Sequence, residues 1–236
     1  MIQDQKLTES VKNFLPSQGA ALVGVGDMEG VENCPYRYAV SIAIPIPAAI
    51  VKPVQERPTP EYCQTYTEMN RSLDEIVLAG ERYLRERGFQ AYALTTDRVK
   101  MRDHVTSVLP HKTAAVRAGL GWIGKNCLLI TEQYGSAIRL STIYTDAPLV
   151  TDEPVSSSKC GACRLCVNAC PGHALKGTLW NAGTSRSEIA DIESCLSAML
   201  AITKESLGFE KDICGRCFAV CRYTRAYLKR QDKVEG

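Results

Sequence analysis

The sequence predicts a mixed fold of the α/β or α+β class, and two patterns in its first 150 residues carry this prediction. Apolar side chains alternate with small or polar ones over residues 39–46, which is the period of two expected of a half-buried strand. Residues 60–88 instead repeat their apolar side chains at spacings of three and four, as the buried face of a helix does. A chain of 236 residues that is 45% hydrophobic is long enough to build a core from both kinds of element.

The other elements follow from short apolar runs and helical spacings between turn residues. Further strands are expected at residues 20–25, 91–96, 127–131 and 137–145. Shorter helices are expected around residues 7–14 and at residues 111–118, and the long helix should end at Gly88. A connection rich in proline and serine near residue 150 then separates two expected domains, residues 1–150 and 151–236.

Charge and terminal sequence restrict the partners and the compartment. A formal net charge of +2 gives no global attraction to nucleic acid or to a membrane surface. The first ten residues lack the features of an export signal, and no apolar run approaches the roughly 20 residues that span a bilayer. We therefore expect a cytoplasmic protein without a membrane partner.

Eleven cysteines are unusual in such a compartment, where disulfides are rare, so metal ligation is the better explanation. Cys160, Cys163, Cys166 and Cys170, followed by Pro171, have the spacing C-x2-C-x2-C-x3-C-P. This spacing is typical of proteins with two 4Fe-4S clusters, in which three thiolates bind one cluster and the fourth binds the other. Zinc is disfavoured because zinc knuckles take two cysteines each.

A second set of cysteines can complete both clusters. Cys214, Cys217 and Cys221 repeat the end of the motif, and Cys195 can replace its missing first member. We therefore expect one cluster on Cys160, Cys163, Cys166 and Cys221 and the other on Cys170, Cys195, Cys214 and Cys217. Cys195 lies on an apolar helical face, so a buried core thiol is the alternative there, and Cys127 is its competitor as a ligand.

The stretch AGLGWIGKN, residues 118–126, matches both the G-x-G-x-x-G dinucleotide motif and most of a phosphate-binding loop. A dinucleotide motif must follow a strand and begin a helix, whereas here the expected helix precedes the glycines and the expected strand follows them. Asn126 also replaces the hydroxyl that would bind magnesium. Two interpretations remain: backbone contact with a large cofactor, or a tight turn beside a buried Trp122.

AGLGWIGKN, followed by YGSAIRLSTIYTDAPL and CGACRLCVNACPGHAL, resembles the epoxyqueuosine reductase family and, more distantly, the cobalamin-dependent reductive dehalogenases. The resemblance is specific over residues 111–221. It implies a nitroreductase-like α/β domain that binds cobalamin with its lower base detached, followed by a ferredoxin-like domain with two 4Fe-4S clusters. It also implies a corrinoid pocket that includes Gly119, Gly121, Trp122, Gly124, Lys125 and Asn126.

The resemblance further implies an oxidoreductase in which a flavodoxin- or ferredoxin-type donor supplies electrons through both clusters to cobalt. An electrophilic small molecule or modified nucleoside would then be reduced. tRNA is a less favoured partner, because the members that act on it continue into a helical-repeat region. The family's proton-donating acid aligns with Val105 here, so Asp103, His111 and Lys112 are the candidate donors, although His111 and Lys112 could equally cap a helix.

Four alternatives stay open from the sequence. The chain could be a pure electron-transfer protein, or it could reduce a corrinoid held by another protein. It could also be a reductive dehalogenase, or a flavin-binding relative of the nitroreductases that carries clusters.

Overall fold

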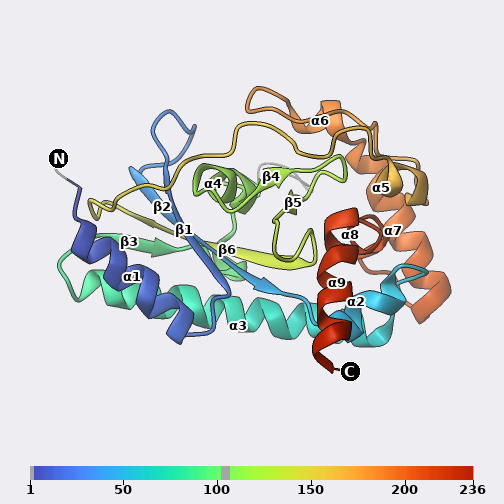
Figure 1. Ribbon diagram of the computed structural model, residues 1–236, viewed down its shortest axis with the longest axis horizontal. Coiled ribbons are helices and arrows are strands. Elements are labelled where there is room, and N and C mark those ends of the chain that lie inside the picture. Colours follow the sequence, from blue (N-terminus) through green and yellow to red (C-terminus); the bar gives the residue numbers. More distant parts are fainter. Residues whose placement is uncertain (1–2, 102–106, 236) are drawn as a thin grey trace. The chain divides into compact units, whose positions relative to one another are not determined.

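The computed structural model describes residues 3–101 and 107–235, and it has the mixed α/β class that the sequence predicts (Figure 1). The strands are β1 (Leu22–Asp27), β2 (Tyr38–Pro45), β3 (Ala91–Ala93), β4 (Trp122–Ile123), β5 (Leu129–Ile130) and β6 (Ile138–Thr145). The helices before residue 150 are α1 (Gln5–Ser17), α2 (Ala48–Val54), α3 (Pro60–Arg85) and α4 (His111–Arg117), with a 3-10 turn η1 (Thr96–Arg98). The later helices are α5 (Leu165–Ala169), α6 (Arg186–Ile189), α7 (Ile192–Leu207), α8 (Arg216–Ala219) and α9 (Arg222–Glu235).

Most predicted elements form close to their expected places. The long helix α3 ends at Arg85, and Gly88 follows it with a left-handed φ of +87°. The strand expected at residues 91–96 is shorter, because β3 ends at Ala93 and the turn η1 begins at Thr96. The helix α2, the two-residue strand β4 and the helices α5, α6, α8 and α9 are additional to the prediction.

The chain forms two compact units, each assembled from separate segments. The first contains Met1–Ile44, Glu68–Leu120 and Arg139–Val155. The second contains Pro45–Thr67, Gly121–Ile138 and Ser156–Gly236. The expected pair of domains, residues 1–150 and 151–236, stays a prediction.

A four-stranded sheet with the order β1-β2-β6-β3 forms the centre of the first unit. β1 pairs antiparallel with β2, and β3 pairs antiparallel with β6, so that Tyr92 lies opposite Tyr144. Successive side chains of a strand point to opposite faces, which separates two cores. On one face, Val40 and Ile143 pack with side chains of α1 and α3, which lie on the same side of the sheet in Figure 1. On the other, Tyr144 packs with Ala114 of α4.

The second unit combines short helices with the hairpin of β4 and β5. Its helix α8 packs against α5, α2 and α9, and the ring of Phe218 in α8 contacts that of Tyr62. This packing places the cysteine-bearing segments around a common centre. None of the helices that the structure describes is long and apolar enough to cross a membrane.

Candidate metal centres

The first cysteine group is built by a tight turn and a short helix. The Cys163 backbone N–H donates to the Cys160 carbonyl at 3.3 Å, and Gly161 between them adopts a left-handed φ of +56°. The helix α5 then begins at Leu165 and carries Cys166 on its buried side. The C-x2-C-x2-C spacing thus brings three sulfur atoms to one side of a single turn of chain.

Cys221, which directly precedes the C-terminal helix α9 in the sequence, also belongs to this group. Burial and, to a smaller extent, the neighbouring thiols of Cys221, Cys160 and Cys163 together raise the pKa of Cys166 to about 12. All four cysteines also line one small cavity together with Lys125. The structure therefore brings together the four cysteines that the sequence predicts for the first cluster.

The second group gathers around Cys217 in α8. Burial raises the pKa of this thiol far above its usual range, and Cys214, Cys195, Cys166 and Cys170 raise it further. Three of these four neighbours are the residues predicted to share its cluster. Cys166 is the exception, so the two groups are adjacent.

Close packing at a glycine positions Cys195 in this group. A Cβ atom on Gly172 would lie 2.6 Å from the Ser194 carbonyl oxygen and 2.7 Å from the Ala198 Cβ, so only glycine lets α7 approach so closely. Asp191 begins that helix by accepting the Ser194 N–H at 3.2 Å. The helix α7 is thereby held against the segment that follows Cys170.

The two cysteine groups share a pattern, in which one cysteine lies within a short helix and another follows that helix. Cys166 lies in α5 and Cys170 follows it, while Cys217 lies in α8 and Cys221 follows it. In each case the cysteine after the helix lies beside the other group: Cys221 raises the pKa of Cys166, and Cys170 raises that of Cys217. This adjacency is compatible with the predicted crossed arrangement of ligands, which stays a prediction.

The donor set fits iron-sulfur clusters better than a single ion. Within residues 3–101 and 107–235, no three His, Cys, Asp or Glu side chains lie close enough together to hold one metal ion. A zinc ion would need its thiolates about 2.3 Å from one centre, whereas a 4Fe-4S cluster binds each thiolate to a different iron atom and holds the sulfurs farther apart. Cluster assembly would replace the thiol protons, which burial holds in place here.

Cys127 lies near the second group and therefore remains a competitor. It is buried, has a left-handed φ of +60°, and raises the pKa of Cys195, although burial, Cys170 and Cys214 contribute more to that rise. Cys195 is the better candidate for the fourth ligand of the second cluster, because it is close to two other members of the group. Which of the two is a ligand stays a prediction.

The glycines of AGLGWIGKN make close contacts with the chain itself. A Cβ on Gly119 would lie 2.7 Å from the Glu153 carbonyl oxygen, and one on Gly121 would overlap the Ile130 carbonyl. Gly124 likewise lies against the Ile130 side chain. These glycines therefore permit close packing within the chain.

Lys125 and Asn126 are also occupied by contacts within the second unit. The Lys125 ammonium, in a residue that is only 5% exposed, donates to the Gly161 carbonyl at 2.7 Å and lies in the cavity of the first cysteine group. Asn126 donates to the Ser136 hydroxyl at 2.9 Å. The motif therefore supports the first cysteine group directly, and its predicted contact with a corrinoid stays a prediction.

Trp122 is the member of the motif that keeps a free polar atom. Its ring is 1% exposed and meets the Tyr223 ring edge-on at a centroid distance of 4.8 Å. The Lys159 ammonium lies 5.4 Å from its centroid. The indole N–H is buried without a hydrogen-bond partner in the described part of the chain, so it is available to a bound group.

Two of the three candidate proton donors lie at the start of α4. The His111 Nδ1 is 2.9 Å from the Thr142 hydroxyl, and burial, with a smaller effect of Arg139, lowers the His111 pKa to about 4. A neutral imidazole is a poor acid near pH 7, which disfavours that role. Lys112 is the next residue and is partly buried. Asp103 lies outside the described residues.

The sequence analysis did not identify Arg222 and Tyr223, which hold the chain near Cys160. Arg222 donates to the Lys159 carbonyl at 2.7 Å, and the Tyr223 hydroxyl donates to the same carbonyl at 3.2 Å. Both contacts join segments more than 60 positions apart. Their adjacency to Cys221 in the sequence is the one signal that could have suggested them.

Comparison with known proteins supports both the fold and the metal. Residues 153–176 match the model of the 4Fe-4S binding domain. The epoxyqueuosine reductase of Listeria monocytogenes is 38% identical over 138 residues, which are 55% of this chain and 34% of that protein. The epoxyqueuosine reductase of Cyclobacterium marinum is 37% identical over 93 residues, covering 39% of this chain and 27% of that protein. The similarity to epoxyqueuosine reductases is confirmed, and the matches span about a third of these relatives or less.

Solved structures share the fold across nearly the whole chain. The catabolic reductive dehalogenase NpRdhA superposes with a TM-score of 0.72 at 20% identity, covering 98% of this chain and 34% of that chain. The epoxyqueuosine reductase of Bacillus subtilis gives a TM-score of 0.59 at 20% identity, covering 94% of this chain and 66% of that chain. The common fold therefore extends beyond the segments in which sequence identity is detectable.

Proposed function

We propose that this protein is an iron-sulfur oxidoreductase of the epoxyqueuosine reductase type, in which two 4Fe-4S clusters conduct electrons. The observation that carries the proposal is the pair of adjacent cysteine groups, whose membership agrees with the crossed ligand pattern. Cys160, Cys163, Cys166 and Cys221 would bind the first cluster, and Cys170, Cys195, Cys214 and Cys217 the second. Because Cys166 lies close enough to Cys217 to raise its pKa, an electron would pass between the two clusters over a short path.

The chain's own residues prepare these sites for electron transfer. Burial of Cys160, Cys166 and Cys221 keeps water from the first cluster, which protects it and strengthens nearby electrostatic interactions. The Lys125 ammonium lies beside this group. Burial raises the pKa of Cys214, and a backbone hydrogen bond from Arg216 and, to a smaller extent, the Arg216 charge oppose that rise. Positive charges at these places stabilise a cluster that has gained an electron.

Cobalamin is the electron acceptor that we propose for the clusters. The support is the fold shared with reductive dehalogenases, one of which is described as performing B12-dependent dehalogenation. When bound, cobalamin would supply a strongly reducing metal centre. The glycines at positions 119, 121 and 124 do not support this part of the proposal, because the chain itself fills the space beside them. Trp122, with its free N–H, supports it more directly.

The proposed substrate is an electrophilic small molecule or modified nucleoside. A structural neighbour with a TM-score of 0.51 is an epoxyqueuosine reductase with an epoxyqueuosine-modified tRNA stem loop, and it covers 98% of this chain at 18% identity. A flavodoxin- or ferredoxin-type donor in the cytoplasm would supply the electrons.

Anaerobic reconstitution followed by cobalamin titration tests this function. We expect the cluster-loaded protein to retain cobalamin through gel filtration at about one cobalt per chain, with a changed visible spectrum, because the protein would replace the solvent around the bound corrinoid. The matched control is the same protein prepared without iron, which reports whether the clusters are needed for retention. Cobalamin that elutes entirely free from protein with intact clusters would contradict the acceptor and favour a pure electron-transfer protein.

A further inference from the structure

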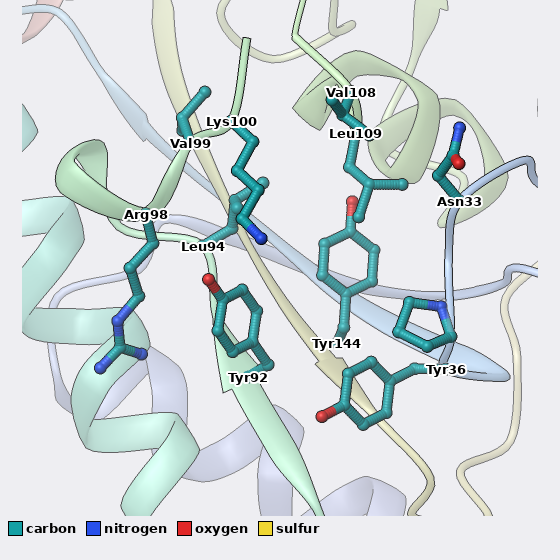
Figure 2. A pocket seen from close by; sticks show the side chains of 11 residues that line it. Asn33, Tyr36, Tyr92, Leu94, Arg98, Val99, Lys100, Val108, Leu109 and Tyr144 are labelled. Carbon is teal, nitrogen blue, oxygen red and sulfur yellow. The ribbon is translucent and has the colours of Figure 1, made fainter. Parts of the chain in front are cut away.

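Buried hydroxyl groups occur in both units, and they differ in what they contact. In the first unit, Tyr144 packs with Tyr36 and Leu109 (Figure 2), and its hydroxyl has no hydrogen-bond partner in the described part of the chain. In the second unit, Ser136 is 3% exposed, and its hydroxyl accepts a hydrogen bond from the Asn126 side chain at 2.9 Å. The Ser136 hydroxyl therefore belongs to a buried polar network, and this network leads to the first cysteine group.

The Asn126 amide determines which way the Ser136 proton points. The Asn126 Oδ1 accepts the Leu128 backbone N–H at 3.2 Å, so the amide nitrogen faces Ser136. An amide nitrogen can only donate, which makes the Ser136 oxygen the acceptor in this contact. The proton of Ser136 must then point to a different acceptor.

The beginning of α9 is held against Ser136. The Ser136 backbone N–H donates to the Thr224 hydroxyl at 3.0 Å, and both residues are buried. Gly135 has a left-handed φ of +60°, and a Cβ atom there would overlap the Thr224 backbone nitrogen. The Cys221 carbonyl accepts the Arg225 N–H at 2.8 Å, so Cys221 is the residue that begins this helix. Residues 135–136 and the start of α9 therefore meet beside Cys221.

The Cys221 sulfur accepts hydrogen bonds from both of these segments. Burial raises the pKa of Cys221, and hydrogen bonds from the backbone N–H groups of Thr224 and Tyr223 oppose that rise. A hydrogen bond from the Ser136 hydroxyl opposes it as well, with a smaller effect. The sulfur is thus the acceptor toward which Asn126 directs the Ser136 proton.

We propose that Ser136, oriented by Asn126, donates a hydrogen bond to the Cys221 sulfur and thereby raises the reduction potential of the first cluster. The proposal rests on the proposed function, because it requires that Cys221 bind a cluster. Reduction adds negative charge to a cluster and its thiolates, and hydrogen bonds to the sulfur atoms stabilise that charge. Asn126 acts through Ser136 as a positioning residue, a role that needs no contact with a corrinoid.

A redox titration followed by electron paramagnetic resonance tests the proposal with Ser136→Ala in the reconstituted full chain. At a fixed potential, we expect the ratio of reduced to oxidised first cluster to fall about tenfold, which corresponds to about 59 mV for one electron. The midpoint potential of the other cluster should stay, and the exposed control Ser156→Ala should change neither. Unchanged potentials in Ser136→Ala, or the loss of about four iron atoms per chain, would overturn the tuning role.

Asn126→Asp tests the orientation of the hydroxyl. A carboxylate at this place can still accept the Leu128 N–H, but it also accepts the Ser136 proton and turns it away from Cys221. The added charge acts with or without the hydroxyl, so we expect Asn126→Asp to lower the ratio about tenfold less in a chain that also carries Ser136→Ala. Equal effects in both backgrounds would overturn the positioning role of Asn126.

The iron content of the natural protein separates this proposal from the proposed function. Fewer than about eight iron atoms per chain before any substitution would refute the two clusters themselves. Full iron content together with an unchanged potential in Ser136→Ala would refute only the hydrogen bond to Cys221.

Discussion

Lys125 is a buried charged side chain that would act on the proposed first cluster. It is 5% exposed, donates to the Gly161 carbonyl and lines the cavity of the four cysteines. Removing its charge should make the cluster harder to reduce. We expect Lys125→Gln to lower the midpoint potential on the order of 50 mV, because about 1.4 kcal/mol corresponds to about 59 mV for one electron.

A redox titration followed by electron paramagnetic resonance measures this shift. Lys125→Arg retains the charge and should retain the potential, and Lys233→Gln, on the exposed end of α9, is the control for an unrelated surface charge. An unchanged or higher potential in Lys125→Gln would show that the ammonium does not act on the cluster.

Cys195 and Cys127 can be distinguished by paired substitutions. Cys195 lies near Cys170 and Cys214, so Cys195→Ser should lose the second cluster while Cys127→Ser keeps both. Bound iron should fall from about eight to about four atoms per chain in the first variant only. The reverse result, with iron lost from Cys127→Ser alone, would exchange their roles.

His111 should make stability depend on pH. Burial lowers its pKa to about 4, below its ordinary value of 6.5, so the folded state binds fewer protons than the unfolded state between these values. Stability from this group is therefore present above pH 6.5 and is lost as the pH falls toward 4, by up to about 3 kcal/mol. Urea unfolding at pH 7 and pH 5 should show a smaller pH effect in His111→Gln than in the natural protein. Equal pH effects would mean that the ring is not buried in solution.

At the residue scale, the grouping of Cys160, Cys163 and Cys166 could be predicted from their spacing in the sequence, because a turn and a short helix fix their positions. The contact of Lys125 with Gly161 could not, since 36 positions separate the two residues. The sequence assigned Lys125 to a corrinoid pocket through family resemblance. Its position beside the cysteines follows only from the three-dimensional fold.

At the scale of elements, the contact between Gly172 and α7 determines whether the second group can assemble. A methyl group at this position would meet the backbone of Ser194 at 2.6 Å, so α7 would have to move. We expect Gly172→Ala to lower the free energy of unfolding by about 1–3 kcal/mol. Bound iron should also fall toward four atoms per chain as Cys195 is displaced.

Denaturant unfolding and iron analysis of the same samples test this expectation. Gly183→Ala is the matched control, because a methyl group there would meet nothing closer than the Asn181 side chain at 3.4 Å. Full iron content and unchanged stability in Gly172→Ala would show that α7 does not depend on the close approach.

The order of elements around the glycine motif was predictable, and this order argues against a nucleotide site. The helix α4 precedes the glycines, and β5 follows them, as the apolar patterns indicate. The two-residue strand β4 is too short to produce a pattern of its own. The helix α2 was missed because it has only seven residues and contains Pro53, which normally disfavours a helix interior.

At the scale of the whole molecule, the sequence is divided between units that are not continuous in the chain. Pro45–Thr67 and Gly121–Ile138 join the cysteine-rich C-terminal segment in the second unit. Such long-range grouping depends on packing between distant segments, so local periodicity could not predict it. The mixed α/β class and the iron-sulfur region, in contrast, follow from local patterns and are confirmed.

Iron, sulfide and Mössbauer analysis of the anaerobically reconstituted chain tests the central claim, that eight cysteines bind two adjacent 4Fe-4S clusters. The expected result is about eight iron and about eight sulfide atoms per chain, with spectra of cubane clusters and magnetic interaction between them after reduction. About four iron atoms per chain, or zinc in place of iron, would contradict the arrangement.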